Sequence, residues 1–458
     1  MKTGAEYRES LKDGRQVYLN GEMVSDPFCH PRLLHAAQWI ADIYDRFYQP
    51  GPEAVNPLFT VPRSPDDLRR RLPDLEGADL TLNTTSQSLL ALMTAAAAMA
   101  DKHPRYVEAI HRYFEHIASN DLRVVECITD AKGDRSLAPS KQADPDSYLH
   151  VVQRRDDGVV IRGAKLHITG APLAHEMVVM PTKQMKEGEE EYAIACAVPV
   201  NAPGVRIVAT TYSPHEDDEA DFPISTRFNM PDGFVIFDDV FVPNEKLFLD
   251  GEVQFSGNFA HALGLWERLG GTAVMADEAD ILVGFAALVA EANGLERISH
   301  VREKISEMII YATLIRAGLE AALVHVGTTV DGMVYPSELY TNAAKFYGAS
   351  EYNHMLRHLH DIAGGAVATA PSNRDFRLPE LSGLLRKYMA TKPDVDGAYR
   401  NQLMRAIRDF TADALGGWRF VTNLQSGGGL YAQRLVARKH YDLVAAKRAA
   451  RQIAGLDD

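Results

Sequence analysis

Apolar residues recur at helical spacing over the first third of the chain. Leu33, Ala37 and Ile40 fall on one face of a helix, and residues 106–117 repeat the pattern on a second helix. The alanine-rich run from Leu89 to Ala100 is too short to span a bilayer and predicts a buried helix. This third is therefore expected to be mostly helical.

Between residues 122 and 249 the pattern becomes typical of β-strands. The runs Tyr148–Val152 and Val159–Ile161 flank the polar turn Arg155–Gly158, which predicts a β-hairpin. Further strands are predicted over residues 177–180, 192–198, 205–210 and 233–237. From Phe255 onward helical periods return, with breaks predicted at residues 293–294, 328–336 and 371–379.

The order of these segments predicts an α+β protein of three domains. They are an N-terminal helical domain over residues 1–121, a middle β domain over 122–254 and a C-terminal helical bundle over 255–458. This order resembles the acyl-CoA dehydrogenase-like plan, in which a flavin lies between the β domain and the bundle.

Charge and cysteine content narrow the class. A formal net charge of −14 over 458 residues offers no basic face for nucleic acid or an anionic membrane, so neither is an expected partner. Cys29, Cys127 and Cys196 are odd in number and widely spaced, which argues against disulfides and zinc and favours a reducing cytoplasm. Because residues 1–15 are polar, no signal peptide or anchor is expected there, and the acidic run His215–Asp221 predicts an exposed loop.

Two polar motifs carry the strongest chemical signal. Asp130–Ser136 combines carboxylates, a lysine, an arginine and a glycine, and Arg162–Ala171 ends in a Thr-Gly-Ala turn. Cations and backbone N–H groups in a tight turn suit an anionic, planar cofactor. The alternative is a polar turn with an internal ion pair.

The chain is similar to the 4-hydroxyphenylacetate 3-hydroxylase family, which also contains 4-hydroxybutyryl-CoA dehydratase. The resemblance covers essentially the whole chain. It rests on Glu6-Tyr7, Ser10–Arg15, Val17–Glu22, Thr129–Arg135, Asp144–Asp146, Gly158–Gly163, Thr169–Ala171, Phe237–Pro243, Asp361–Gly365, Pro371-Ser372 and Tyr431–Arg434. It implies the acyl-CoA dehydrogenase-like fold, FAD as cofactor and a homotetramer.

The resemblance also implies a flavin site. Its expected cofactor-binding residues are Cys127, Thr129, Lys132, Gly133, Asp134, Arg135, Ser136 and Thr169, with the loop Ser426, Gly427, Gly428 and Gly429 closing over the flavin. A run of glycines allows close backbone approach to phosphate or ribose.

The chain departs from both branches of the family at the substrate. Thr85, Leu89 and Glu126 stand where the phenol hydroxylases have an arginine, a tyrosine and a histidine for the phenolic hydroxyl. A glutamate is expected to repel a phenolate. The dehydratases hold a four-iron, four-sulfur cluster on three cysteines and a histidine, and the equivalent positions here are Thr85, Leu89, Leu265 and Thr272. No iron–sulfur cluster is therefore expected.

Glu126 and His167 are the remaining catalytic candidates. A carboxylate shielded from water beside a flavin would have a raised pKa and could act as a general acid or base. The alternative for Glu126 is a structural partner of Arg123 or Lys132. Strand alternation places His167 on the face of Thr169, where it could reach the cofactor or simply fill space with a hydrogen bond.

One further cluster has metal-like spacing. His354 and His358 lie at helical i, i+4 spacing, with Glu351 and Asp361 nearby. No glutamate stands between the two histidines as in zinc proteases. A solvated or inter-subunit face is therefore favoured, and no metal site is predicted.

These residues support three functions. The leading hypothesis is the FAD-dependent oxygenase component of a two-component monooxygenase, acting on an aromatic or related small molecule. No nicotinamide fingerprint is present, so a separate reductase is expected as partner. Its dry substrate pocket would contain Thr85, Leu89, Glu126 and Thr182. The alternatives are a cluster-free flavoprotein acting on a small acyl-CoA, and a flavin-binding subunit without chemistry of its own.

Overall fold

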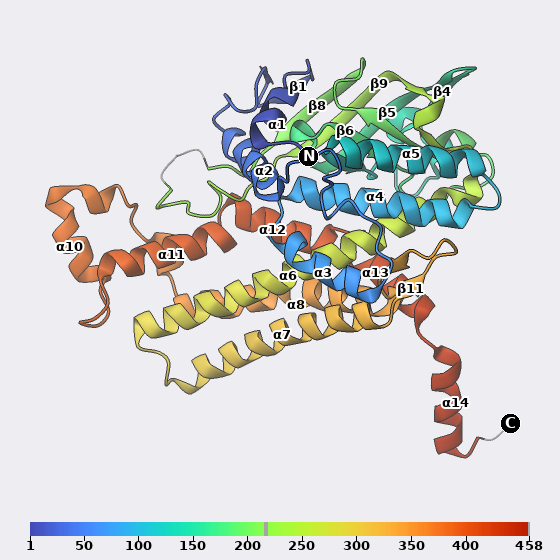
Figure 1. Ribbon diagram of the computed structural model, residues 1–458. Coiled ribbons are helices and arrows are strands. Elements are labelled where there is room, and N and C mark those ends of the chain that lie inside the picture. The colour runs from blue at the N-terminus through green and yellow to red at the C-terminus, as the bar shows by residue number, and fades with distance from the viewer. Residues whose placement is uncertain (215–218, 457–458) are drawn as a thin grey trace.

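The computed structural model describes residues 1–214 and 219–456. Helices dominate the N-terminal segment, and strands the segment after it (Figure 1). The first elements are α1 (Gly4–Ser10), β1 (Val17–Leu19), β2 (Glu22–Val24), α2 (Leu34–Phe47), α3 (Pro65–Glu76), α4 (Leu80–Met99) and α5 (Pro104–Asn120).

Helix α4 contains the alanine-rich run and is buried along most of its length, as predicted. Asp79 caps its start and accepts hydrogen bonds from the backbone N–H groups of Thr81 at 2.7 Å and Leu82 at 3.0 Å. Because apolar residues surround the helix on all sides, it can lie between the β-strands and the C-terminal bundle (Figure 1). Helix α4 contacts both β3 and α6, the two elements that carry much of the candidate site described below.

The strands form two principal sheets. The six-stranded sheet has the order β2-β1-β8-β9-β5-β4, with β4 (His150–Arg155), β5 (Gly158–Thr169), β8 (Val205–Thr210) and β9 (Asp232–Pro243). The four-stranded sheet has the order β10-β7-β6-β3, with β3 (Val124–Cys127), β6 (Glu176–Val179), β7 (Ile194–Pro199) and β10 (Leu247–Asp250). The predicted hairpin is confirmed, since Arg155 pairs with Gly158 across a two-residue turn.

Two features of the sheets differ from the sequence pattern. The short strands β1 and β2 add a hairpin from the N-terminal segment to β8, and three-residue strands leave too little alternation to be read. Strand β5 carries a bulge between Lys165 and Ile168, and His167 adopts a left-handed φ of +61° within it. The expected alternation is wrong here, because Lys165 is buried whereas His167 is exposed.

The C-terminal segment is helical. Its elements are α6 (Val253–Asn293), α7 (Ser299–Val324), β11 (Gly327-Thr328), β12 (Val334-Tyr335), α8 (Glu338–Ala363), α9 (Ala366–Thr369), α10 (Pro379–Met389), α11 (Gly397–Thr411), α12 (Ala414–Gln425), α13 (Gly429–His440) and α14 (Leu443–Ala454). Short 3₁₀ helices cover Pro139–Lys141, Pro145–Ser147, Ala171–Leu173, Glu190–Tyr192, Asn244–Lys246 and Asp375–Arg377. The three predicted breaks all separate consecutive helices, and Gly294 ends α6 in a left-handed conformation.

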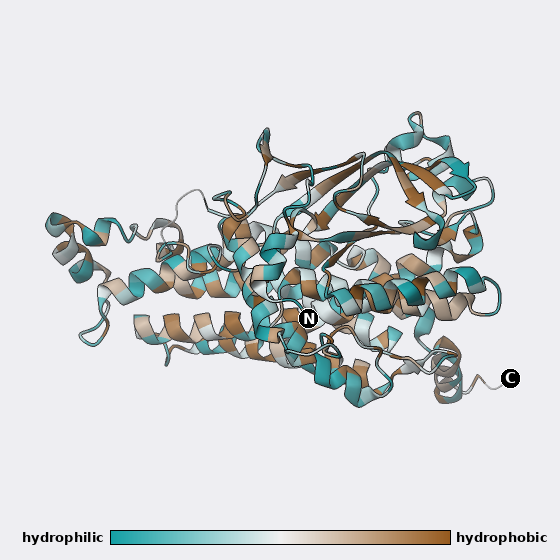
Figure 2. Ribbon diagram, turned by 45° about the horizontal axis from the view of Figure 1, so that its top comes forward, coloured by the Kyte–Doolittle hydropathy of each residue, from teal (hydrophilic) through white to brown (hydrophobic). Residues whose placement is uncertain are grey.

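The long helices α6, α7 and α8 pack together below the sheets, whereas α14 extends away from the bundle with no buried residue (Figure 1). Hydrophobic residues concentrate along the strands and between the helices (Figure 2). The fold class is confirmed as α+β. The division into three domains after residues 121 and 254 stays a prediction.

The acidic run at residues 215–221 was expected to be an exposed loop, and no segment was expected to cross a membrane. Residues 215–218 of the acidic run lie outside the described residues, but Asp221 is buried, with its Oδ1 atom 3.0 Å from Arg405 Nε. The end of that run is therefore an internal ion pair instead of an exposed loop. Within the described residues, no helix is both long and apolar enough to cross a membrane.

Candidate active site

Glu126 lies on β3, which is the edge strand of the smaller sheet and packs on α4. Its Oε1 atom is shielded from solvent and has no hydrogen-bond partner in the described residues. Burial raises the pKa of Glu126 well above its usual range, and the nearby charge of Glu267 raises it further. Ser88 on α4 lies close enough to oppose this shift, although its own hydroxyl is buried without a well-aligned partner.

Arg123, one of the two expected structural partners of Glu126, is engaged elsewhere. Arg123 lies 3.7 Å from a carboxylate oxygen of Asp79 and 3.7 Å from one of Asp121, and its guanidinium stacks 3.9 Å from the ring centre of Tyr44. Glu126 is therefore not the counterion of Arg123.

Thr85 fixes the strand that carries Glu126. Its hydroxyl accepts a hydrogen bond from the Val124 N–H at 2.8 Å and donates to the Thr81 carbonyl at 2.6 Å. Because these backbone contacts occupy the fully buried hydroxyl, Thr85 positions β3 on α4. This differs from the expectation that Thr85 contacts substrate. Leu89, one turn further along α4, is buried and apolar as expected, and Thr182 is half-buried after β6.

Glu267, Arg268 and Lys345 bring charge to the same site from the bundle. Burial raises the pKa of Glu267, while the Gly427 N–H and the cations of Lys345 and Arg268 oppose the shift. Burial lowers the pKa of Lys345 to about 8, and its ammonium donates to the Asn423 carbonyl at 2.7 Å. Sequence reasoning missed this group, because its members come from two long helices, α6 and α8, whose polar residues follow no clear pattern.

The glycine loop between α12 and α13 closes on Arg268. Gly427, Gly428 and Gly429 have φ angles of +70°, +90° and +66°, a conformation that side chains resist. Arg268 Nε donates to the Gly427 carbonyl at 2.8 Å, and a Cβ on Gly427 would approach Arg268 Cγ to 2.8 Å. Arg268 Nη1 is shielded from solvent and has no partner in the described residues. The predicted loop therefore combines a tight backbone with a buried cation that is free to bind an anion.

The loop at residues 130–136 divides into a buried anchor and an exposed cationic turn. Asp130 is buried and lies 2.8 Å from Lys165 Nζ, while it accepts the Leu149 N–H at 3.0 Å. Lys165 also donates to the carbonyls of Ile128 at 3.0 Å and Met180 at 2.9 Å. Asp130 therefore holds the sheets together and is not available to a cofactor.

Residues 133–136 form the exposed part, and Lys132 beside them is half-buried. Lys132 and Gly133 have φ angles of +72° and +50°, and the Asp134 carboxylate accepts from the N–H and hydroxyl of Ser136 at 2.9 and 2.7 Å. Neither Lys132 nor Arg135 has a carboxylate within 4 Å among the described residues, so the expected alternative of an internal ion pair is wrong. Burial and the repulsion from Arg135 lower the pKa of Lys132. Unneutralised cations on a fixed turn favour an anionic ligand.

Asp232 is a junction that the sequence pattern did not reveal. It accepts hydrogen bonds from the Thr169 hydroxyl at 2.6 Å, from Trp418 Nε1 at 2.9 Å and from the Tyr212 hydroxyl. The Tyr212 and Trp418 rings lie 5.2 Å apart. This cluster joins the end of β5 and the start of β9 to α12, so it ties the sheet to the bundle beside the predicted flavin-binding residue Thr169.

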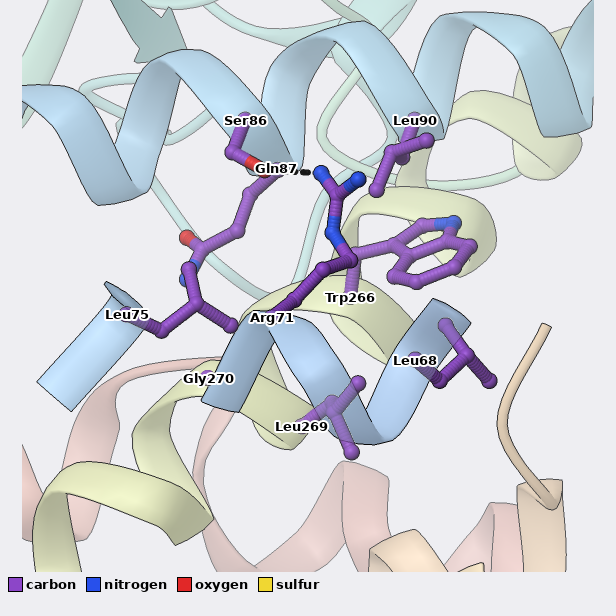
Figure 3. Close-up of a pocket in the computed structure, with 9 residues that line it drawn as sticks. All are labelled: Leu68, Arg71, Leu75, Ser86, Gln87, Leu90, Trp266, Leu269 and Gly270. Carbon is purple, nitrogen blue, oxygen red and sulfur yellow. Dashed lines mark hydrogen bonds between the residues drawn. The ribbon is translucent and has the colours of Figure 1, made fainter. Parts of the chain in front are cut away.

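A small internal cavity separates α3, α4 and α6 (Figure 3). Arg71 donates to the Ser86 hydroxyl at 2.8 Å along one wall, and Gln87 packs on Gly270. A Cβ at Gly270 would lie 2.3 Å from Gln87 Nε2, so any larger residue there would require the end of the Gln87 side chain to move. The cavity volume of about 10 Å³ suits one water molecule and excludes a substrate.

Two further predicted cofactor-binding residues, Cys127 and Thr129, lie at the end of β3 and just beyond it. Cys127 is fully buried between strands, where burial raises its thiol pKa, and Thr129 accepts the Leu166 N–H through its carbonyl at 2.7 Å. Cys127 on β3 pairs with Val179 on β6, and Val179 pairs in turn with Cys196 on β7, so one strand separates the two thiols. Two buried thiols in one sheet cannot replace the four ligands of a cubane cluster.

The elements and site described above define a flavoprotein-type scaffold, the acyl-CoA dehydrogenase-like fold. Family models for the N- and C-terminal regions of 4-hydroxyphenylacetate 3-hydroxylase match residues 3–249 and 256–455. The chain therefore belongs to the 4-hydroxyphenylacetate 3-hydroxylase family.

Both branches of the family appear among the relatives. The chain is 31% identical to the oxygenase component of 4-hydroxyphenylacetate 3-monooxygenase from Thermus thermophilus, over 91% of this chain and 89% of that protein. It is 28% identical to 4-hydroxybutyryl-CoA dehydratase/vinylacetyl-CoA-Δ-isomerase from Clostridium aminobutyricum, over the full length of both.

The solved structures show the same duality. The oxygenase component of 4-hydroxyphenylacetate 3-monooxygenase complexed with FAD aligns with a TM-score of 0.90 and 29% identity, covering 99% of this chain and 98% of that one. The 4-hydroxybutyryl-CoA dehydratase from N. maritimus aligns with a TM-score of 0.91 and 27% identity, covering 100% and 95%. Overall similarity therefore does not separate the two chemistries.

Proposed function

We propose that this protein is the FAD-dependent oxygenase component of a two-component monooxygenase that hydroxylates an aromatic or related small molecule. The observation that carries the proposal is the match of the whole chain to an FAD-complexed oxygenase component, combined with the absence of cluster ligands at Thr85, Leu89, Leu265 and Thr272. The reduced flavin would come from a separate reductase.

The residues present fit FAD. Lys132 and Arg135 supply unpaired cations for the pyrophosphate, and Arg268 Nη1 is a buried donor without a partner in the described residues. The left-handed glycines keep Cβ atoms away from the same region. Thr169, Ser426 and the glycine loop would hold the flavin, which supplies the electrons for oxygen activation when it is bound in reduced form.

The carboxyl pair Glu126 and Glu267 would move the proton. Both pKa values are raised by burial, which favours a proton on the pair, and Ser88 and Leu89 are buried beside Glu126 and limit the access of water. A protonated Glu126 donates a hydrogen bond to a substrate oxygen and accepts the proton back through the pair. Lys345 would stabilise the pair whenever Glu267 is ionised.

A homotetramer and a cytoplasmic location complete the proposal. Helix α14 has no buried residue, and Leu443, Val444 and Ile453 are exposed on it. Apolar side chains on a helix without intramolecular contacts support a second copy of the chain as their partner.

A cluster-free enzyme acting on a small acyl-CoA is the second candidate. The full-length match to the dehydratase branch and a shielded carboxyl that can abstract a proton both favour it. Such an enzyme would turn over anaerobically, without net consumption of reduced flavin.

One set of measurements separates the candidates. The purified protein is titrated with FAD and reduced FAD, and reduced FAD is then supplied by a reductase to a panel of phenols in air. A hydroxylated product supports the oxygenase. If every compound yields only free hydrogen peroxide, and an acyl-CoA is converted without oxygen, the oxygenase proposal is wrong. Full flavin occupancy without either reaction would instead identify a flavin-binding subunit.

A further inference from the structure

His354 and His358 lie one turn apart on α8, on the face that meets α7. The structure adds a residue that the sequence pattern did not connect to them. Glu307 on α7 places its Oε2 atom 2.7 Å from His358 Nε2. A third potential metal ligand thus comes from the neighbouring helix.

The three side chains present their ligand atoms to a common point. One ligand atom from each of Glu307, His354 and His358 lies within 4.8 Å of the other two, and the two imidazole rings are 4.5 Å apart. Metal–nitrogen and metal–oxygen bonds of about 2.0–2.2 Å require ligand atoms about 3.4 Å apart in a tetrahedral site. Because Glu307 is exposed and His354 half-buried, rotation of their side chains supplies this closure while α7 and α8 stay in place.

The surroundings are also suitable. Glu351 Oε2 lies 3.6 Å from His354 Nδ1 and adds negative charge beside the three side chains. The nearby cation of Lys304 is paired with Asp361. A second-sphere carboxylate and a neutralised lysine both lower the electrostatic cost of a divalent cation.

We propose that Glu307, His354 and His358 bind a divalent transition-metal ion, best suited to Zn²⁺, that links α7 to α8. Two imidazoles and one carboxylate are a frequent zinc ligand set, with the fourth position left to water. The site lies on the bundle and shares no residue with the candidate active site, so its role is to stabilise the helix pair (Figure 1).

The test is calorimetric titration of the full-length, chelator-treated protein with Zn²⁺. We expect H354A, H358A and E307Q each to weaken binding at least about tenfold, because loss of a direct ligand costs no less than loss of a second-sphere partner. H360A is the matched control, because His360 is on the same helix but bonds to the Thr411 hydroxyl at 2.7 Å. Zn²⁺ should also raise the melting temperature of the wild type and of H360A, but not of H354A/H358A.

A second group needs its own control. His261, Glu338 and His440 also bring ligand atoms within 4.8 Å of one another. The proposal predicts that H261A retains the ion that H354A/H358A loses. Undetectable Zn²⁺ binding by the wild type, or affinity that H354A/H358A leaves unchanged, would overturn it.

Discussion

Replacement of Glu126 by glutamine should change the number of protons that the protein releases on unfolding. Burial and Glu267 raise the folded-state pKa of Glu126, whereas an unfolded glutamate titrates near 4.3. Between these two pKa values the folded chain binds more protons than the unfolded chain. The free energy of unfolding therefore decreases as pH rises through this window, by about 1.4 kcal/mol per pH unit for each proton, and levels off above the folded pKa.

The assay is proton release when the protein is unfolded by guanidinium in weakly buffered solution at pH 5.5. An unfolded glutamate is only about 6% protonated there, so E126Q should release fewer protons than the wild type, with about 0.9 proton as the upper limit that a fully protonated Glu126 would give. The count does not require reversible unfolding.

Glu176 supplies a matched control of opposite sign. It lies on the adjacent β6, where Lys246 Nζ contacts both carboxylate oxygens at 2.7 and 2.9 Å, and its pKa is lowered. Glu176 is therefore ionised in both states at pH 5.5, and E176Q should lose stability without changing the proton count. Equal proton release by E126Q and the wild type would refute the raised pKa of Glu126.

Three further predictions concern the cofactor. K132A/R135A should weaken FAD binding about tenfold or more in a fluorescence titration, since each charge-assisted hydrogen bond contributes about 1.5–3 kcal/mol, while K12A should bind as the wild type does. G427A should lower both FAD affinity and melting temperature, because its Cβ meets Arg268 in a left-handed turn, whereas G417A lies in a helix with free space and should be neutral or stabilising. Protein purified without oxygen should contain no stoichiometric iron by elemental analysis, and a four-iron absorption spectrum would contradict the ligand assignment.

The sequence predicted those parts of the fold whose signals are local. The hairpin around Arg155–Gly158 and the end of α6 at Gly294 each depend on a turn residue beside a clear repeat. His167 was misplaced because one inserted residue in β5 reverses the alternation beyond it, and a bulge leaves no reliable mark on an apolar pattern.

The site was predictable only where the chain itself brings residues together. Asp130 and Lys132 are two residues apart in sequence, yet Asp130 is a buried anchor and Lys132 is a half-buried cation. The position of Lys165 in the fold decides this difference. The Asp232 junction draws its partners from strands, a loop and a bundle helix, and Glu307 reaches His358 from another helix. Such contacts depend on tertiary packing, so a single sequence without its fold cannot reveal them.

The pKa of Glu126 also changes the argument about substrate. A glutamate in place of the family's histidine was expected to repel a phenolate, which assumed an ionised carboxylate. In its buried site, Glu126 favours the protonated form, and a carboxylic acid can donate a hydrogen bond to a phenolic oxygen as a histidine does. Substrate affinity should therefore fall as pH rises and Glu126 ionises, while E126Q, whose amide remains a neutral donor, keeps its affinity at high pH. Isothermal titration of a phenol across this range tests the idea, and the same pH dependence in both proteins would show that Glu126 does not bind the substrate oxygen.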